Sequence, residues 1–310
     1  MQTENHPKDS SKNFSSPIFY RFAQFIGFLL GAKVFVTILL TFALYVSTFF
    51  LFNQMESLRS FVFDYKVHGI IFCTILSILA GGIINQFYDR EKDQLVKPFR
   101  TRIQNFLKQK YFLYSYIILN LVSLTVAFLI SPRVLFFFLV YQFLMWFYSH
   151  KLAKILIINN LTFVSLVLYP FFGMLVYYQT FSVKIFLMAV FLFLILLIID
   201  IIKDQLTKKA DLLFNYHTFA TEFSKRSNVN LVSFLLLLNS VISILLLLKM
   251  GVLGFLNGYF IAGIVMFLVL IIFNLKQRKN SYFISLNILR VWIFVGILSM
   301  LIDGILVKYS

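Results

Sequence analysis

The sequence predicts an all-α integral membrane protein with nine transmembrane helices, and the composition, the apolar runs and the placement of charge all favour this class. Of its 310 residues, 60% are hydrophobic and 13% are charged, and the mean hydropathy is +0.88. Soluble domains carry about 25% charged residues. The composition therefore excludes an ordinary soluble domain.

Nine apolar runs are long enough to cross about 30 Å of hydrocarbon as helices of roughly 17 to 25 residues. They lie near 22–51, 67–88, 111–131, 133–149, 157–178, 183–202, 228–249, 252–275 and 283–305. Their polarity alternates too little for barrel strands, so helices are expected to satisfy the backbone in lipid. Residues 1–16 are polar and are expected to be a disordered tail, which leaves 17–310 as one nine-helix transmembrane domain.

Basic residues are divided unevenly between the two ends of these predicted helices. The loops after the second, fourth, sixth and eighth runs carry 17 Lys and Arg residues, whereas the other connections carry five. Lys and Arg collect in loops that stay on the cytoplasmic side. We therefore expect a cytoplasmic N-terminus and an external C-terminus. The net charge of +16 then reports orientation in the membrane, and no nucleic-acid partner is expected.

Two acidic clusters stand out in this apolar chain. Asn85, Asp89 and Asp93 are spaced by four at the end of the second run, and Asp200 and Asp204 repeat that spacing at the end of the sixth. Residues four apart share one face of a helix. Both runs are expected to end on the cytoplasmic side, and carboxylates at the edge of an apolar helix are costly. The two clusters therefore predict one shared functional site.

The atoms of these clusters suit a metal ion and a diphosphate. Carboxylate and amide oxygens are the ligands that Mg²⁺ prefers, and Mg²⁺ often bridges to substrate phosphates. Cations nearby would face the phosphate oxygens that the metal leaves free. These cations are Lys97, Arg100, Arg102, Lys203 and Lys208.

Taken in order, the motifs resemble those of the UbiA superfamily of intramembrane aromatic prenyltransferases. The run Asn85 to Asp93, followed by Lys97-Pro98-Phe99-Arg100, is similar to the first signature of that superfamily, N-D-x-x-D-x-x-x-D. Asp200-x-x-x-Asp204 is similar to the second signature. Further residues in matching positions are Tyr148, Ser149, Lys154, Asn160, Pro170, His217 and Thr218.

The resemblance implies a helical bundle around a central cavity that opens near the cytoplasmic face. Members bind a polyprenyl diphosphate through Mg²⁺ held between the acidic motifs, release diphosphate and join the prenyl carbon to an acceptor. The implied catalytic residues are Asp89, Asp93, Asp200 and Asp204, which with Asn85 are also the implied metal ligands. The implied diphosphate-binding residues are Asn85, Lys97, Arg100, Arg102, Tyr148, Lys154, Lys203, Lys208 and Arg21.

Two positions depart from the family pattern. Gln86 stands where the family has its first Asp, and Asp211 stands where a glycine-like residue is expected. A Gln carbonyl still offers an oxygen to Mg²⁺, so both a changed metal affinity and a weakened homologue stay open. Lys33 and Arg290 lie inside apolar runs, where a cation is costly, and their roles stay open.

Two other classes of protein are compatible with the charges. A transporter with an intramembrane ion site would show matched repeats broken by Gly or Pro, and the sequence has no convincing repeat of this kind. A CDP-alcohol transferase would carry glycines between closely spaced aspartates, which neither cluster has. For a prenyltransferase we expect a quinone precursor or a glycerol-phosphate lipid as acceptor, among the lipids of a bacterial inner membrane.

Overall fold

The computed structural model describes residues 17–53, 57–249, 254–276 and 280–309, and the regular elements in these ranges are all helices. Among them, nine helices are long and apolar enough to cross a membrane. The all-α class and the number of spans predicted from the sequence are thereby confirmed. The polar tail predicted at 1–16 lies outside the described residues.

The long helices begin and end close to the predicted runs. They are α2 (Val34–Ser47, continued by the π-helical turn η2, Thr48–Phe52), α4 (Tyr65–Tyr88), α7 (Gln109–Ile130), α8 (Pro132–His150), α9 (Ile158–Tyr178), α10 (Val183–Leu213), α12 (Lys225–Lys249), α13 (Phe255–Leu275) and α14 (Ser281–Tyr309). The shorter helices are α1 (Pro17–Gly31), α3 (Leu58–Val62), α5 (Arg90–Val96), α6 (Pro98–Gln104), η3 (Leu152–Lys154) and α11 (Phe219–Glu222).

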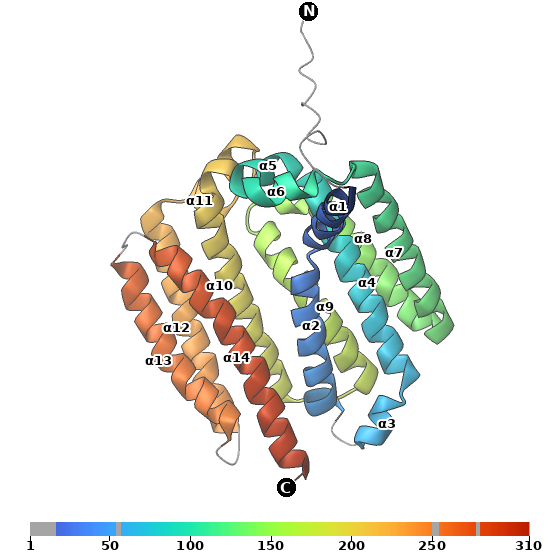
Figure 1. The fold of residues 1–310 in the computed structure, drawn as a ribbon. Coiled ribbons are helices and arrows are strands. Elements are labelled where there is room, and N and C mark those ends of the chain that lie inside the picture. The colour runs from blue at the N-terminus through green and yellow to red at the C-terminus, as the bar shows by residue number, and fades with distance from the viewer. Residues whose placement is uncertain (1–16, 54–56, 250–253, 277–279, 310) are drawn as a thin grey trace, which may run out of the picture.

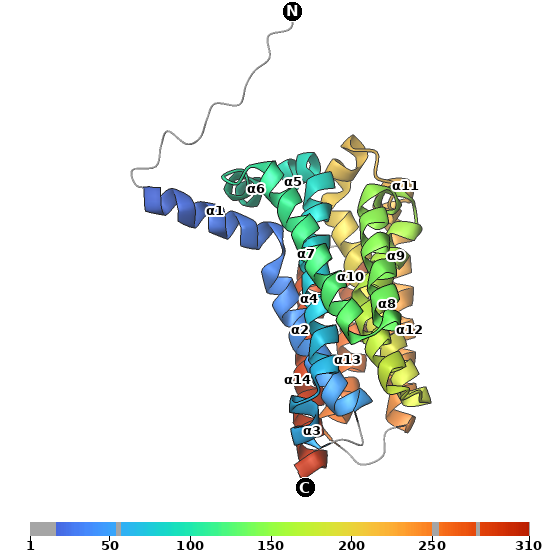
Figure 2. The same cartoon turned by 90° about the vertical axis from the view of Figure 1, so that its right-hand side faces the viewer.

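The long helices stand side by side along one common direction (Figures 1 and 2). The short helices α5, α6 and α11 gather at one end of the bundle, whereas α3 and the C-terminus lie at the other end (Figure 1). Helices α4 and α10 both run towards the end that carries α5 and α11. The two acidic clusters therefore emerge at the same end of the molecule.

The apolar interior has two parts. One part is formed mainly by α10, α12, α13 and α14, where Ile195, Leu236 and Phe267 are fully buried. The other part is formed mainly by α2, α4, α7, α8 and α9, where Ile71 and Phe138 are fully buried. Helices α4 and α10 belong to different parts, so the acidic clusters face each other where the two parts meet.

Buried hydroxyl and amide groups add hydrogen bonds between α4, α7 and α8. The Oγ atoms of Ser77 and Ser123 lie 3.1 Å apart, and Gln142 Nε2 donates to Ser77 Oγ over 3.2 Å. Cys73 Sγ donates to the Ser123 carbonyl over 3.2 Å. Such interhelical bonds contribute about 0.6 kcal/mol each in membranes. The single cysteine is thus a buried packing residue, as its place inside an apolar run predicts.

The first predicted run, 22–51, is divided into two helices that point in different directions. Helix α1 leaves the bundle crosswise to α2 (Figure 2), and Lys33 between them adopts a left-handed backbone conformation with φ 54°. The junction packs closely on α4, because a Cβ atom at Gly82 would lie only 2.8 Å from the Ala32 carbonyl oxygen. Arg21 therefore lies exposed on α1 and does not begin the first span.

Candidate active site

The second acidic cluster is a buried pair of carboxylates on α10. Asp200 and Asp204 are only 3% and 7% exposed. Asn160, near the start of α9, donates from Nδ2 to Oδ2 of each carboxylate, and both distances are 2.9 Å. Lys203 Nζ lies 3.0 Å from Asp200 Oδ1. The amide holds both carboxylates in one orientation, because one NH₂ group is shared between them.

The first acidic cluster centres on Asp89, the residue at which α4 ends. Asn85 Nδ2 donates to Asp89 Oδ2 over 2.9 Å, and the Tyr216 hydroxyl donates to Asp89 Oδ1 over 2.6 Å. Tyr216 lies in the loop between α10 and α11 and is buried. Burial and the neighbouring Asp89 carboxylate raise the pKa of Tyr216, so its hydroxyl stays protonated and keeps donating to Asp89.

Both clusters line one cavity of about 470 Å³, part of which is open to solvent. Six of the residues predicted from the sequence line it, namely Asn85, Asp89, Tyr148, Asp200, Lys203 and Asp204. We call this space the catalytic cavity, after the catalytic residues that the resemblance implies for it. Its other lining residues are Lys33, Lys92, Ala153, Asn159, Phe163, Tyr216 and Thr218.

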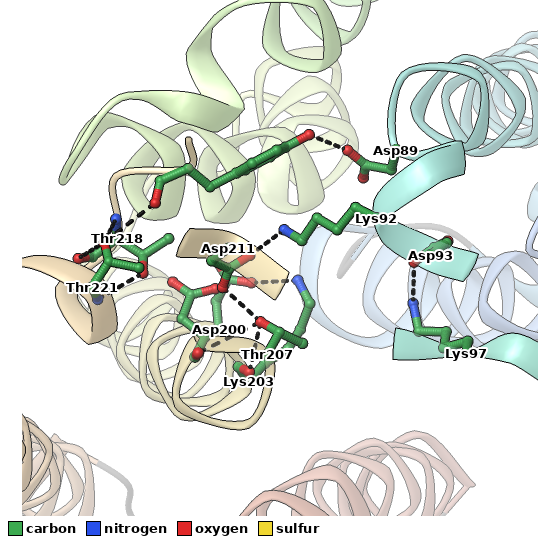
Figure 3. Close-up of polar contacts among 12 residues, drawn as sticks. Asp89, Lys92, Asp93, Lys97, Asp200, Lys203, Thr207, Asp211, Thr218 and Thr221 are labelled. Atoms are coloured by element: carbon green, nitrogen blue, oxygen red, sulfur yellow. Dashed lines mark hydrogen bonds and ion pairs between the residues drawn. The ribbon is translucent and has the colours of Figure 1, made fainter. Parts of the chain in front are cut away.

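The remaining predicted residues lie outside the lining of the catalytic cavity. Asp93 is on α5, where Lys97 Nζ lies 3.1 Å from its Oδ1, away from Asp200 (Figure 3). Arg100 donates to the Leu30 carbonyl at the end of α1. Lys154 stacks over the Tyr216 ring at 5.2 Å. Arg21, Arg102 and Lys208 have no lining contact either.

Asp93 does not share the face predicted for it because the helix is interrupted at Asp89. The backbone of Asp89 has φ −91° and ψ 7°, and α5 begins anew at Arg90. Spacing by four places side chains on one face only within a continuous helix. Asp93 consequently leaves the stripe that Asn85 and Asp89 share.

Lys92 and Asp211 form a contact that the sequence does not predict. Lys92 Nζ lies 2.5 Å from Asp211 Oδ1 and 3.8 Å from the centre of the Tyr216 ring. Asp211 is fully buried and also accepts a hydrogen bond of 2.8 Å from Thr207 Oγ1 (Figure 3). Asp211, which departs from the family pattern, thus joins α10 to α5 through Lys92, a residue that lines the catalytic cavity.

Lys33 is, after Lys92, a second cation in the lining of the catalytic cavity that was not among the predicted site residues. Of the cavity-lining cations in the described residues, Lys92 and Lys203 are each paired with a carboxylate, whereas no ion pair is formed by Lys33. Burial lowers the pKa of the Lys33 ammonium to about 8, and the Asp89 carboxylate opposes that shift. Its only sequence signal was a cation inside an apolar run.

A family model identifies the class of protein that this cavity belongs to. The model of the UbiA prenyltransferase family matches residues 60–289. The chain belongs to the UbiA prenyltransferase family. It is therefore a prenyltransferase, and neither the transporter nor the CDP-alcohol transferase considered from the sequence is retained.

Individual UbiA proteins resemble this chain in sequence and in fold. A digeranylgeranylglyceryl phosphate synthase from Methanosphaera stadtmanae is 29% identical over 186 residues, which cover 59% of this chain and 67% of that protein. A structure of digeranylgeranylglyceryl phosphate synthase superposes with a TM-score of 0.69 at 18% identity and covers 91% of this chain and 99% of its own. A UbiA homolog from Archaeoglobus fulgidus bound to GPP and Mg²⁺ gives 0.62 at 14% identity, with 88% and 99% covered. The predicted UbiA-like bundle is thereby confirmed.

The donor atoms of this UbiA cavity fit a hard divalent cation. Asn85, Asp89, Asp200 and Asp204 supply amide and carboxylate oxygens from two helices, which is the donor chemistry of Mg²⁺. Across the described ranges, no three His, Cys, Asp or Glu side chains are already gathered into a closed metal centre. Mg²⁺ commonly takes one or two carboxylates and completes its shell with water and substrate phosphate, so a partial set of ligands suits it.

Gln86, which replaces the first Asp of the family pattern, lies on a different side of α4 from Asn85 and Asp89. Its side chain lines a second cavity, which shares no lining residue with the catalytic cavity. Its Oε1 atom is buried without a hydrogen-bond partner. In this UbiA protein, the change from Asp to Gln therefore removes no oxygen from the lining of the catalytic cavity.

Proposed function

We propose that this protein transfers a polyprenyl group from a polyprenyl diphosphate to a glycerol-phosphate lipid inside the membrane, in a reaction that depends on Mg²⁺. One observation carries the proposal: the acidic ends of α4 and α10 line a single cavity together with Lys33, Lys92 and Lys203. Carboxylates for a metal and cations for phosphate oxygens are what a diphosphate site needs.

The metal would be held by oxygens of Asn85, Asp89, Asp200 and Asp204. When bound, Mg²⁺ would neutralise negative charge that develops on the departing diphosphate. Asn160 and Tyr216 act as positioning residues, because each holds carboxylate oxygens of this set by a hydrogen bond. Asp93 stays a predicted ligand on sequence grounds alone.

The diphosphate would lie against the cations of the catalytic cavity. Among these cations, Lys33 is the one whose charge is not already paired with a carboxylate in the described residues. Lys203 is paired with Asp200, and Lys92 is paired with Asp211. The other residues predicted for this role, Lys97, Arg100, Arg102, Lys154, Lys208 and Arg21, stay predictions. Tyr148 lines the cavity and offers a hydroxyl to the same oxygens.

The reaction exchanges one carbon–oxygen bond for another. The bond between the prenyl C1 carbon and the diphosphate oxygen breaks, and both electrons leave with diphosphate. The acceptor hydroxyl forms a new bond to C1 and gives up its proton. The allylic cation formed between these steps needs a site with little water, and the aromatic rings of Phe163 and Tyr148 in the lining also stabilise positive charge.

The choice of acceptor rests on the relative from Methanosphaera stadtmanae, which is a digeranylgeranylglyceryl phosphate synthase. This relative favours a glycerol-phosphate lipid over a quinone precursor. The orientation with the N-terminus and the catalytic cavity on the cytoplasmic side rests on the surplus of Lys and Arg in those loops. Location in a bacterial inner membrane stays a prediction.

The test uses protein purified in detergent, labelled geranylgeranyl diphosphate and two acceptors, a geranylgeranylglyceryl phosphate and a hydroxybenzoate quinone precursor. We expect prenylated glycerol-phosphate lipid with Mg²⁺ and none with excess EDTA. Product from the quinone precursor alone would replace the proposed acceptor. Release of diphosphate without any prenylated product would indicate a weakened homologue.

A further inference from the structure

The second cavity lies where the end of α4 meets α5, α6 and α7. It measures about 300 Å³, part of it open to solvent. Its lining comes from the end of α4, the start of α5, the end of α6 and the start of α7, and consists of Ile83, Gln86, Phe87, Arg90, Gln104, Asn105, Leu107, Gln109 and Phe112. None of these residues lines the catalytic cavity.

Arg90 gives this second cavity a positive charge that no carboxylate in its lining balances. One guanidinium nitrogen donates to Gln109 Oε1 over 2.9 Å, and the other donates to Asn105 Oδ1 over 3.1 Å. Both acceptors are neutral amides, so they hold the guanidinium in place without cancelling its charge. Lys92, Lys97 and Lys203 at the same end of the molecule are each paired with an aspartate.

Two buried amide groups in the same lining lack hydrogen-bond partners. Gln104 is only 2% exposed, and its Nε2 atom has no acceptor. Gln86 Oε1 is buried and has no donor. Buried polar groups are usually paired, so an unpaired donor in the lining of a cavity can serve a ligand there. Gln86 Oε1 faces Gly31 of α1, so the unpaired group left for a ligand in this cavity is Gln104 Nε2, in the same lining as the guanidinium of Arg90.

The cavity lies beside α1, and α1 carries apolar side chains on its exposed surface. Phe28 of α1 stacks on Phe112 of the cavity with ring centres 6.1 Å apart. Ile18, Phe22 and Phe25 on α1 are 80%, 58% and 56% exposed. Exposed apolar side chains on a helix that runs crosswise to the spans (Figure 2) are typical of a helix lying in the membrane interface.

We propose that the second cavity binds the phosphate of a phosphate ester, and that its natural source is the head group of an anionic membrane lipid. The phosphate oxygens would accept hydrogen bonds from Arg90 and from Gln104 Nε2. The interfacial position of α1 favours a lipid over a soluble phosphate compound. Because the two cavities share no lining residue, this lipid would be a bound neighbour of the reaction and not a reactant.

The experiment is native mass spectrometry of delipidated protein in detergent, titrated separately with phosphatidylglycerol, phosphatidylcholine and glycerol phosphate. Phosphatidylglycerol carries a net negative charge on its phosphate, whereas the head group of phosphatidylcholine carries no net charge. We expect phosphatidylglycerol to bind in preference to phosphatidylcholine. Arg90→Gln should weaken its apparent affinity by about tenfold, since it removes a charged hydrogen-bond donor.

Two further variants complete the design. Gln104→Met keeps Arg90 and removes the unpartnered donor, so it should weaken binding by about threefold to tenfold. Lys108→Gln removes one exposed charge nearby without touching either cavity and should change the affinity by less than about twofold.

Wild-type affinity in Arg90→Gln, or in Gln104→Met if Arg90→Gln does not fold, would overturn the proposal. An equal preference for phosphatidylcholine would also overturn it. Glycerol phosphate binding as tightly as phosphatidylglycerol, with the same dependence on the variants, would support the phosphate-ester site and replace the lipid by a soluble source.

Discussion

The junction of α4 and α5 presents opposite charges to two cavities. Asn85 and Asp89 line the catalytic cavity, and Gln86 and Arg90 line the second. In the first, a carboxylate is held by two neutral donors, the Asn85 amide and the Tyr216 hydroxyl. In the second, a guanidinium is held by two neutral acceptors on Asn105 and Gln109.

This comparison teaches that neutral partners can fix a charged side chain and leave its charge available. A carboxylate fixed in this way suits a cation, and a guanidinium fixed in this way suits an anion. It also shows why neighbouring residues of one sequence motif can have unrelated roles. Neighbouring residues of a helix are turned by about 100° from each other, so Asn85 and Gln86 face different surroundings.

The largest expected effect comes from removing a carboxylate of the catalytic cavity. Asp204→Asn leaves a side chain of the same size and takes away one negative charge beside Asn160. We expect kcat for prenyl transfer to fall by a factor on the order of 10²–10³, as for other groups that act on developing charge. Asp303→Asn at the opposite end of the bundle is the matched control. Activity within about tenfold of wild type would contradict the role given to Asp204.

The second prediction separates the two faces of α4 directly. Asn85→Ala should lower kcat/KM by about 100-fold, because it removes an oxygen of the catalytic cavity and a donor to Asp89. Gln86→Met should lower it by less than about threefold, since that side chain lines the other cavity. Both are measured as initial rates at saturating Mg²⁺. A larger loss of kcat/KM in Gln86→Met than in Asn85→Ala would contradict the assignment of these two residues to different cavities.

The third prediction concerns how Asp89 is held. Tyr216→Phe removes the 2.6 Å hydrogen bond to Asp89 and keeps the ring under Lys92. We expect the Mg²⁺ concentration for half-maximal activity to rise by roughly 10- to 100-fold, as for outer groups that orient a metal ligand. Because its pKa is raised, the hydroxyl of the wild type stays a donor at neutral and mildly alkaline pH. An unchanged Mg²⁺ requirement would show that Asp89 needs no such support.

The fourth prediction uses the lowered pKa of Lys33. Its ammonium loses the proton as the pH rises through about 8, and the neutral amine no longer attracts a diphosphate. We expect kcat/KM for the prenyl diphosphate to fall by about tenfold between about pH 7 and 9, because this ratio reports groups of the free enzyme. Lys33→Arg keeps the charge over that range and should remove this decline. A decline that persists in Lys33→Arg would assign it to another group.

Several features of this site were predictable from the sequence, and the others depend on interruptions that carry no local signal. The i, i+4 spacing predicts that Asp200 and Asp204 share a face, because α10 continues unbroken past both to Leu213. The same spacing is misleading for Asp93, since the helix stops at Asp89. Gly31 and Lys33 lie at the break in the run 22–51, but one glycine or one cation in an apolar run does not by itself predict a break, and its position is determined by packing against α4.

Linker residues are the other part that sequence patterns do not place. Tyr216 and Lys33 lie between helices, where no periodicity relates them to the acidic clusters. Both line the catalytic cavity because α1, α10 and α11 pack where they do. Asp211 differs again: it lies on α10, seven residues after Asp204, yet its pairing with Lys92 depends on where α5 turns after the break.

The smallest expected effect on activity comes from a carboxylate that lines neither cavity. Asp303 near the far end of α14 accepts hydrogen bonds of 2.7 Å from the backbone N–H groups of Phe255 and Leu256, and so caps the start of α13. Loss of such a cap costs about 1–2 kcal/mol, so Asp303→Ala should lower the unfolding temperature in detergent. The activity of the protein that remains folded should stay near wild type. A carboxylate is therefore no evidence of catalysis by itself. A large loss of kcat in Asp303→Ala without loss of stability would contradict the contrast drawn between the carboxylates of the catalytic cavity and a carboxylate that only caps a helix.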